Sequence, residues 1–440
     1  MIVRPDADNS ACPRQIVPEP WKSSIKFAAV TDVGMRRANN QDAHMVVPAD
    51  SKERYLSRGH LFVVADGMGA HAAGELASRI AAEQIPLYYL RKSSGDAREA
   101  LREAVQQANH DIHQRGQQNH EFHNMGTTAS SLAILPAGAI VAHVGDSRVY
   151  RLRDDRLEQL TFDHSLVWEM EAAGQFKSDS QLCGSIPKNI ITRSLGPSPT
   201  VAVDIEGPFP VRSGDRFLLC SDGLTGQIDD AEIGPLLSAL PPAQAARMLV
   251  DLANLRGGPD NTTVVVVEVG EQEQNADGGE GAGYRALGDP SLPRPMLLAA
   301  SVCLLAAILL GISGNIGPMV VALILGAIAG GVAAFQYRQR RGLIIDNGDD
   351  AQPRRAGPYR SCAAKPTAEL LAKLDQIIEA LRNAASERRW NIDWRRVDAL
   401  IVDDQRFRRQ GRFAEAMKLQ ADAIVETMGQ LRNQQRGGPL

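Results

Sequence analysis

Five aspartates that end apolar runs or lie in turns are the residues of this sequence best suited to chemistry: Asp42, Asp66, Asp146, Asp222 and Asp260. Two of them end strand-like runs and precede glycine, in VVADG (Val63 to Gly67) and LLCSDG (Leu218 to Gly223). A carboxylate at the end of a buried strand is costly unless a cation neutralises it. Oxygen ligands without a Cys or His cluster favour Mg²⁺ or Mn²⁺ over zinc. A pair of such ions can deprotonate water for an in-line displacement at phosphorus.

The hydrophobic pattern predicts the elements that position these aspartates. Apolar runs predict strands from Ile25 to Gly34, from Gly59 to Ala65 and from Thr262 to Val269. Apolar residues on one helical face predict helices from Gly74 to Leu90 and from Asp96 to Arg115, the second capped by Asp96. Further strands are predicted at Thr127 to Leu135, Ala139 to Val144 and Arg148 to Arg153, and further helices at Ser165 to Ala173 and Pro242 to Arg256.

Composition narrows the class of protein. The length of 440 residues allows more than one domain, and the hydrophobic content of 44% fits a globular core. The 48 basic and 52 acidic residues nearly balance, so no overall field indicates nucleic acid as a partner. The 5 cysteines are scattered and lack CxxC spacing, which argues against a disulfide framework or a thiolate metal site and favours a reducing compartment.

Shifts in composition divide the chain into segments. Residues 1–23 form a polar, proline-containing leader, residues 24–270 a globular domain, and residues 271–295 a flexible linker. Residues 296–336 contain two charge-free apolar runs around GNIGP, which predict a transmembrane helical hairpin; a buried helical pair is the alternative. Arginines outside both runs predict a protein of the cytoplasmic membrane, with its globular domain and its tail on the cytoplasmic side.

The C-terminal part is predicted to be a second linker, residues 337–366, and a helical tail, residues 367–440. Helical periodicity is clear around Leu370 to Leu381, Trp394 to Gln410 and Phe413 to Leu431. The segment GRFAEA, Gly411 to Ala416, is similar to the turn and second helix of a tetratricopeptide repeat, but one repeat cannot bury its own face. A small bundle that binds a partner protein or self-associates is the alternative interpretation.

The aspartates lie in a series of motifs that together resemble a known family. The segments are TDVGMRRANNQDA (Thr31 to Ala43), VVADGMGAHAAGELAS (Val63 to Ser78), MGTT (Met125 to Thr128), VGDSRVYRL (Val144 to Leu152), LTFDHSLV (Leu160 to Val167), ITRSLG (Ile191 to Gly196), LLCSDGL (Leu218 to Leu224) and GGPDNTTVVVV (Gly257 to Val267). In this order they look like the bacterial branch of the metal-dependent serine/threonine protein phosphatases of type 2C, over about Ile25 to Val269.

The resemblance implies an α+β fold, a four-layer β-sandwich of two antiparallel sheets flanked by helices, with two Mn²⁺ or Mg²⁺ ions at one end. It implies that Asp66 bridges both ions, that the Gly67 carbonyl joins one, and that Asp222 and Asp260 hold the other. Asp42 is expected to act through bound water, and Asp146 with Asp222 to form a third, weaker site. A hydroxide that bridges the two ions would then attack phosphoserine or phosphothreonine in phosphorylated proteins, opposing Ser/Thr kinases.

Two further residues complete the expected site. Arg37 matches the arginine that grips the substrate phosphate, and its guanidinium fork suits phosphate oxygens; the neighbouring Arg36 is the alternative. His71 is the motif histidine that could protonate the leaving alkoxide, with a structural role as the alternative. Ala70 stands where the family usually has glycine. Two other functions are weighed against the enzyme: a catalytically silent phosphoprotein-binding scaffold of the same fold, and an adaptor governed by the tail.

Overall fold

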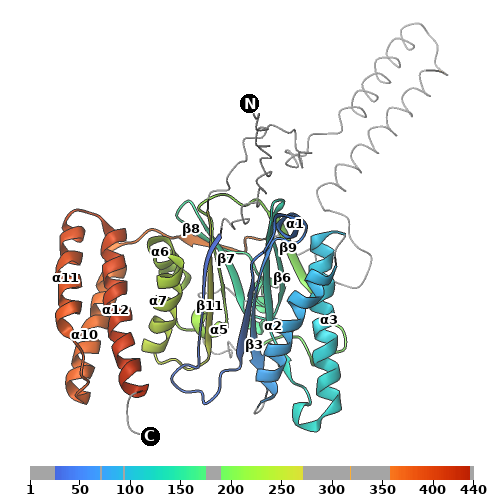
Figure 1. Cartoon of the computed structure of the whole chain (residues 1–440), viewed down its shortest axis with the longest axis horizontal. Helices are drawn as coiled ribbons and strands as arrows, with labels where there is room; N and C mark the ends of the chain where they lie inside the picture. Colours follow the sequence, from blue (N-terminus) through green and yellow to red (C-terminus); the bar gives the residue numbers. More distant parts are fainter. Residues whose placement is uncertain are drawn as a thin grey trace, which may run out of the picture. The chain divides into compact units, whose positions relative to one another are not determined.

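The computed structural model describes residues 25–69, 72–92, 95–174, 190–270, 318 and 357–436. The described parts of 25–270 and 357–436 belong to one compact unit, in which two antiparallel sheets lie between layers of helices (Figure 1). This arrangement confirms the predicted α+β class with two antiparallel sheets.

The two sheets each contain strands from distant parts of the sequence. In order across the first sheet lie β1 (Ile25–Asp32), β11 (Thr262–Val269), β10 (Arg216–Cys220), β7 (Arg148–Arg153), β8 (Arg156–Gln159) and β12 (Arg360–Ala363). In order across the second lie β2 (Asp42–Val47), β3 (His60–Met68), β5 (Ala129–Leu135), β6 (Gly138–Val144) and β9 (Asp204–Phe209), with β4 (Gly126–Thr127) paired to β3.

The sheets stack because their central strands are apolar on both faces. In β3, Phe62 and Val64 pack between the sheets, whereas Leu61 and Val63 point to the outer helices. Successive side chains of a strand alternate between its two faces, so a continuous apolar run fits a strand that is covered on both sides. The run VVVV in β11 is divided in the same way between the inter-sheet core and the core beneath the helices.

Helices cover the outer face of each sheet. Helices α2 (Ala73–Arg91) and α3 (Ala97–Gln118) cover the second sheet, and α6 (Asp230–Ala239) and α7 (Pro242–Leu255) cover the first (Figure 1). The predicted cap of α3 is confirmed, since the Asp96 side chain accepts a hydrogen bond from Arg98 N. The shorter helices are α1 (Lys52–Ser57), η1 (His120–Phe122), α4 (Leu166–Ala172) and α5 (Asp222–Thr225).

The tail packs against the globular domain. Its helices are α10 (Ala368–Arg388), α11 (Trp394–Arg409) and α12 (Phe413–Arg436), and α12 contacts α6 and α7. Apolar tail residues such as Leu371 and Ile424 share one core with Leu249 of α7. Strand β12 lies inside the stretch predicted to be a linker, so that prediction is wrong for the last part of residues 337–366.

The predicted transmembrane hairpin, residues 296–336, lies outside the described residues except for Pro318. The described helices include none with both the length and the apolar composition needed to cross a membrane.

Candidate functional site

Five aspartates from both sheets meet at one end of the sandwich. Asp42 begins β2 and pairs directly with Asp66 near the end of β3. Asp146 lies in the turn between β6 and β7, Asp222 begins α5 directly after β10, and Asp260 precedes β11. Because β10 pairs with both β7 and β11, the first sheet brings the last three residues to the same end. The fold therefore gathers side chains that are far apart in sequence.

Hydrogen bonds with neighbouring hydroxyls hold the Asp42 carboxylate and the Asp66 backbone in place. Ser221 Oγ donates to Asp42 Oδ2 at 2.6 Å. The backbone of Asp66 is held on both sides, since its N–H donates to Thr128 Oγ1 at 2.9 Å and its carbonyl accepts from Thr127 Oγ1 at 2.8 Å. Asp42 and Asp222 are thereby tied together, because Ser221 immediately precedes Asp222.

The cluster is electrostatically unfavourable without a cation. Burial, followed by the neighbouring carboxylates, raises the pKa of Asp42 to about 7 and that of Asp146 to about 8. Burial and the charges of Asp42, Asp222 and Asp146 raise the pKa of Asp66 well above its usual range. Burial and the charge of Asp260 raise the pKa of Asp222 as well. A divalent cation would displace the protons that these raised pKa values favour.

The donor chemistry of the cluster fits a divalent cation. Oδ1 of Asp42, of Asp146 and of Asp222 is buried and has no hydrogen-bond partner among the described residues. Buried oxygens without partners are costly and suit Mg²⁺ or Mn²⁺. No set of three or more His, Cys, Asp or Glu side chains in the described ranges forms a ready metal cage. Charged carboxylates repel one another, so we expect an ion to draw them inward, with backbone oxygen and water completing its shell.

The backbone around Gly67 is too crowded for any other residue. A Cβ atom at Gly67 would lie 2.1 Å from the carbonyl oxygen of Gly74 and 2.5 Å from that of Gln41. The glycine thus allows β3, α2 and the loop before β2 to approach one another closely. This close approach holds Asp66 beside Asp42.

Arg37 lies beside the cluster, as expected. Its Nη2 donates to Asp260 Oδ2 at 2.7 Å, and 50% of its side chain is exposed. Asp260 therefore contacts the guanidinium, while its charge also raises the pKa of Asp222 and of Asp42. An exposed guanidinium next to a carboxylate cluster can hold an anionic ligand at the cluster's edge.

Other residues of the motifs lie partly inside and partly outside the described chain. His71 and Ala70 lie outside the described residues. His164, in the motif LTFDHSLV, is a hydrogen-bonding residue: its Nδ1 accepts from Gly145 N at 2.9 Å and its Nε2 lies 3.0 Å from Asp204 Oδ2. Ser165 is the N-cap of α4 but makes no side-chain capping bond.

Asn261 supports the site, although no role at the site was predicted for it from the sequence. Its Oδ1 accepts from Gln41 N at 2.8 Å, and its Nδ2 donates to the carbonyls of Val33 and Asn39 at 2.9 and 3.0 Å. Asn261, the residue directly after Asp260, therefore anchors the loop that carries Arg37. Its place in the motif GGPDN could have indicated a role near Asp260. No local pattern identified its distant partners Gln41, Val33 and Asn39.

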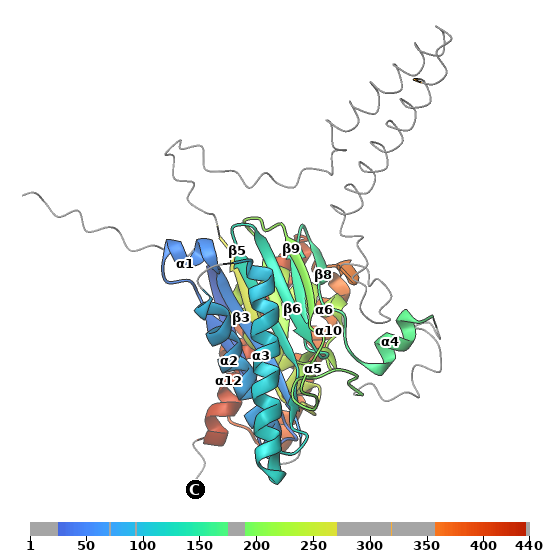
Figure 2. The same cartoon turned by 90° about the vertical axis from the view of Figure 1, so that its right-hand side faces the viewer.

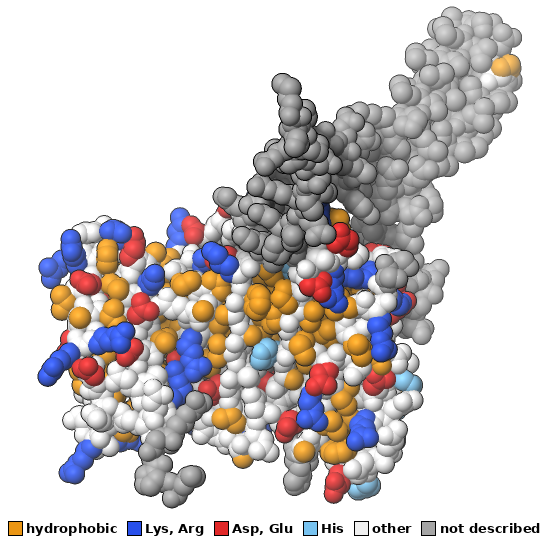
Figure 3. All heavy atoms as spheres, viewed as in Figure 1, with side chains coloured by type: hydrophobic (Ala, Val, Ile, Leu, Met, Phe, Trp, Pro, Cys, Tyr) orange, Lys and Arg blue, Asp and Glu red, His pale blue; other side chains and the backbone are white. Residues whose placement is uncertain are grey.

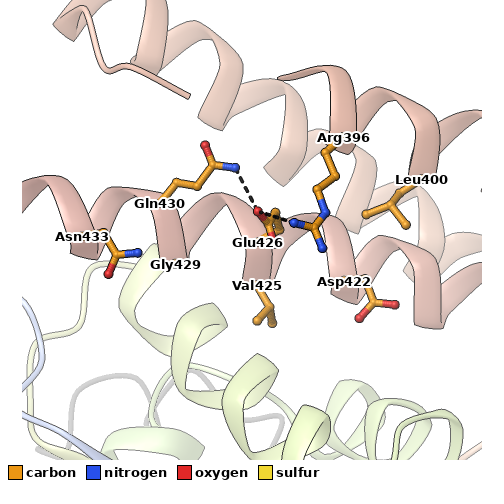
Figure 4. A pocket seen from close by; sticks show the side chains of 8 residues that line it. All are labelled: Arg396, Leu400, Asp422, Val425, Glu426, Gly429, Gln430 and Asn433. Carbon is orange, nitrogen blue, oxygen red and sulfur yellow. Dashed lines mark hydrogen bonds and ion pairs between the residues drawn. The ribbon is translucent and has the colours of Figure 1, made fainter. Parts of the chain in front are cut away.

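The tail contains a separate groove of about 480 Å³, which none of the five aspartates lines (Figure 4). Gln430 Nε2 donates to Glu426 Oε1 at 3.0 Å, and Arg396 Nη1 lies 3.6 Å from the same oxygen. These polar side chains satisfy one another. The lining residues are Arg396, Leu400, Asp422, Val425, Glu426, Gly429, Gln430 and Asn433.

Comparisons with known proteins identify the family of this chain. A model of the protein phosphatase 2C family matches residues 35–252. Protein phosphatase PhpP of Streptococcus pneumoniae is 37% identical over 255 residues, which cover 57% of this chain and 99% of PhpP. Serine/threonine protein phosphatase PstP of Mycobacterium tuberculosis is 34% identical over 249 residues, which cover 56% of this chain and 45% of PstP.

Solved structures of serine/threonine phosphatases are also similar to this chain. The S. agalactiae serine/threonine phosphatase has 34% sequence identity and a TM-score of 0.50, over 56% of this chain and 99% of that one. The catalytic domain of PstP in complex with 2 manganese ions has 33% identity and a TM-score of 0.48, over 56% and 99% of the two chains. The chain is a serine/threonine phosphatase. It belongs to the protein phosphatase 2C family, and enzymes of this kind act on phosphorylated proteins.

Proposed function

We propose that the five-aspartate cluster is a metal centre with which this phosphatase hydrolyses phosphoserine and phosphothreonine in proteins. The observation that carries the proposal is the buried Oδ1 atom on each of Asp42, Asp146 and Asp222, for which the described part of the chain offers no hydrogen-bond partner. Asp66, the Gly67 carbonyl, Asp222 and Asp260 would hold two Mn²⁺ or Mg²⁺ ions, and Asp146 with Asp222 a third, weaker one. When bound, the ions supply an activated water and neutralise charge on the phosphate.

The chain's own residues would orient the substrate. Arg37 has half of its side chain exposed and would turn its guanidinium fork toward two phosphate oxygens, which a lysine could not contact in the same way. Asp42 would act through water while Ser221 Oγ holds its carboxylate in place. His71, four residues after Gly67 in the sequence, would give a proton to the leaving alkoxide.

The test combines metal binding with turnover. Purified protein should release phosphate from a phosphothreonine peptide with Mn²⁺, and calorimetry should show Mn²⁺ binding to the peptide-free protein. Asp222→Asn should weaken Mn²⁺ binding and lower kcat by at least about a hundredfold. Undiminished Mn²⁺ affinity in Asp222→Asn would contradict the assignment of the ligands even if the enzyme is active.

We further propose that residues 296–336 anchor the enzyme in the cytoplasmic membrane, with its globular domain and tail on the cytoplasmic side. Support comes from the two charge-free runs, Met296 to Ser313 and Met319 to Phe335, and from the arginines outside them. The full chain should remain in the membrane fraction after alkaline carbonate washing, and a chain that lacks 296–336 should not. Recovery of the full chain in the soluble fraction would exclude the anchor.

Charge gives no reason to add a nucleic-acid partner. The net charge is −4, and acidic and basic side chains are interspersed over the face seen in Figure 3. Nucleic-acid binding usually requires a basic stripe or patch.

A further inference from the structure

Strand β12 brings residues from beyond the matched phosphatase region into the catalytic sheet. It pairs antiparallel with β8, and Tyr359 N donates to the carbonyl of Gln159 at 2.9 Å. We propose that Arg360 of this strand is a positioning residue for the phosphatase reaction, which holds helix α4 and, through Trp168 and Arg148, the turn that carries Asp146. The inference rests on the proposed metal centre.

Arg360 holds α4 through two contacts. Its guanidinium carbon lies 4.0 Å from the centroid of the Trp168 ring, and its Nη2 lies 3.1 Å from Glu171 Oε2. Trp168 is the only buried residue of α4, with 9% of its surface exposed. A cation over a largely desolvated indole ring interacts more strongly than it does at an open surface. Figure 2 shows that α4 projects away from the sandwich, on the side of the sheets where β8 lies.

Tyr359 fixes the register that presents Arg360. Its hydroxyl donates to Glu206 Oε1 at 2.5 Å. Its ring packs edge-on against Phe162 at 5.6 Å, and Phe162 packs edge-on against Trp168 at 5.3 Å. The aromatic contacts and the strand pairing therefore place Arg360 at the same ring.

One route leads from Trp168 to Asp146. The guanidinium carbon of Arg148 lies 5.6 Å from the Trp168 ring centroid, and Arg148 Nη2 lies 2.7 Å from Asp163 Oδ2. Gln159 Nε2 also donates to Asp163 Oδ1 at 2.8 Å, and the Gln159 carbonyl is the acceptor for Tyr359 N. Arg148 lies two residues after Asp146. Strand β12 therefore supports the turn that carries Asp146 through Trp168 and Arg148, and also through Gln159 and Asp163.

A second route leads from α4 to Asp66. Thr192 Oγ1 donates to Glu169 Oε1 at 2.7 Å, which joins α4 to the segment that continues to Leu195. Leu195 exchanges two backbone hydrogen bonds with Thr127, and Thr127 Oγ1 donates to the Asp66 carbonyl at 2.8 Å. A displacement of α4 can thus shift two candidate metal ligands, Asp146 and Asp66. Small displacements of ligands or positioning groups cost rate steeply.

The test compares two matched arginines in the full chain. Arg360→Met removes the charge over Trp168. Arg382→Met is the control, because Arg382 lies 4.7 Å from the Trp394 ring and pairs with Asp398 entirely within the tail. We expect Arg360→Met to lower kcat/KM for a phosphothreonine peptide about tenfold, mainly through kcat, and to speed amide hydrogen exchange in Leu166–Ala172. Arg382→Met should change neither, and Arg360→Lys should recover part of both.

A double-mutant cycle tests the route through the ring. In a Trp168→Leu background, Arg360→Met should cause little further loss of kcat/KM, because the two side chains act as one unit. Additive losses, equal losses in Arg382→Met, or unchanged hydrogen exchange in α4 would each overturn the inference. Hydrogen exchange can be measured whether or not the protein turns over substrate. An inactive wild-type protein would therefore count against the proposed function, while hydrogen exchange in α4 would still test whether Arg360 holds this helix.

Discussion

Arg37 Nη2 and Asp260 Oδ2 are 2.7 Å apart, although 223 residues separate them in the sequence. The two side chains are 50% and 35% exposed, and exposed ion pairs contribute little to stability. The pair is better explained by function, since it places a guanidinium next to a candidate metal ligand. A phosphate at this position would compete with Asp260 for the same donors.

We expect Arg37→Lys to lower kcat/KM for a phosphopeptide by about ten- to a hundredfold, with little change in thermal stability. Lysine retains the charge but loses the two-pronged contact with phosphate oxygens. Steady-state kinetics measures the effect, and Arg36→Lys is the matched control. Equal losses in both variants would indicate that the charge of the loop matters and not the fork of Arg37.

The carboxylate cluster should make the metal-free protein less stable as pH rises. The folded-state pKa is about 7 for Asp42 and about 8 for Asp146, against about 3.9 for an unperturbed aspartate. The folded state therefore binds more protons than the unfolded state between these values, and the free energy of unfolding falls as pH rises. Burial lowers the pKa of His60 and of His143, which gives the opposite slope below about pH 6.5.

The informative window for this experiment is therefore about pH 6.5 to 8. Urea unfolding in the presence of EDTA should show decreasing stability across it, and Asp146→Asn should reduce the slope. Saturating Mn²⁺ should restore stability at the higher pH, because the ion binds the deprotonated carboxylates. Stability that rises with pH in EDTA would contradict the prediction.

Gly223 should be irreplaceable for a steric reason. A Cβ atom there would lie 1.9 Å from the carbonyl oxygen of Asn261, so alanine would push α5 away from the start of β11 and separate Asp222 from Asp260. We expect Gly223→Ala to destabilise the protein by about 2 kcal/mol or more and to abolish most Mn²⁺ binding in calorimetry.

Gly429 in α12 is the control for this substitution, since a Cβ atom there would meet nothing within 4 Å. Gly429→Ala should leave Mn²⁺ binding unchanged and raise stability by up to about 1 kcal/mol, the usual gain within a helix. Similar Mn²⁺ affinity in both variants would show that the contact with Asn261 does not set the cluster geometry.

The tail should stabilise the globular domain through Arg432. Arg432 of α12 forms an ion pair with Asp251 of α7, whose side chain is fully buried, and Arg247 lies 3.5 Å from the same carboxylate. Arg432→Met should lower the free energy of unfolding by about 2–3 kcal/mol, because it leaves a buried charge with weaker compensation. Urea unfolding measures the effect.

Arg102→Met provides the comparison, because the Arg102–Glu99 pair is half-exposed on α3 and such pairs contribute at most about 0.5 kcal/mol. If Arg432→Met is as mild as Arg102→Met, the tail is held by its apolar contacts and not by this ion pair.

The sequence by itself determined most of the central strands, such as β3 and β11, the helices α2, α3 and α7, and the aspartates at strand ends and in turns. These features are local: the run VVVV of β11, the cap Asp96 and the motif VVADG each carry their signal within a few neighbouring residues. The series of motifs was sufficient to indicate the family, because each motif couples a candidate ligand to the turn that presents it.

Only the tertiary structure decided which distant residues support the cluster and where the tail lies. The bond from Ser221 to Asp42 and the loop held by Asn261 depend on contacts between segments whose partners no local pattern specifies. Strand β12, with the sequence RSCA, lacks a distinctive hydrophobic pattern and forms because β8 offers an unpaired edge. That pairing depends on the finished sheet, so the contact of Arg360 with Trp168 could not be read from the chain alone.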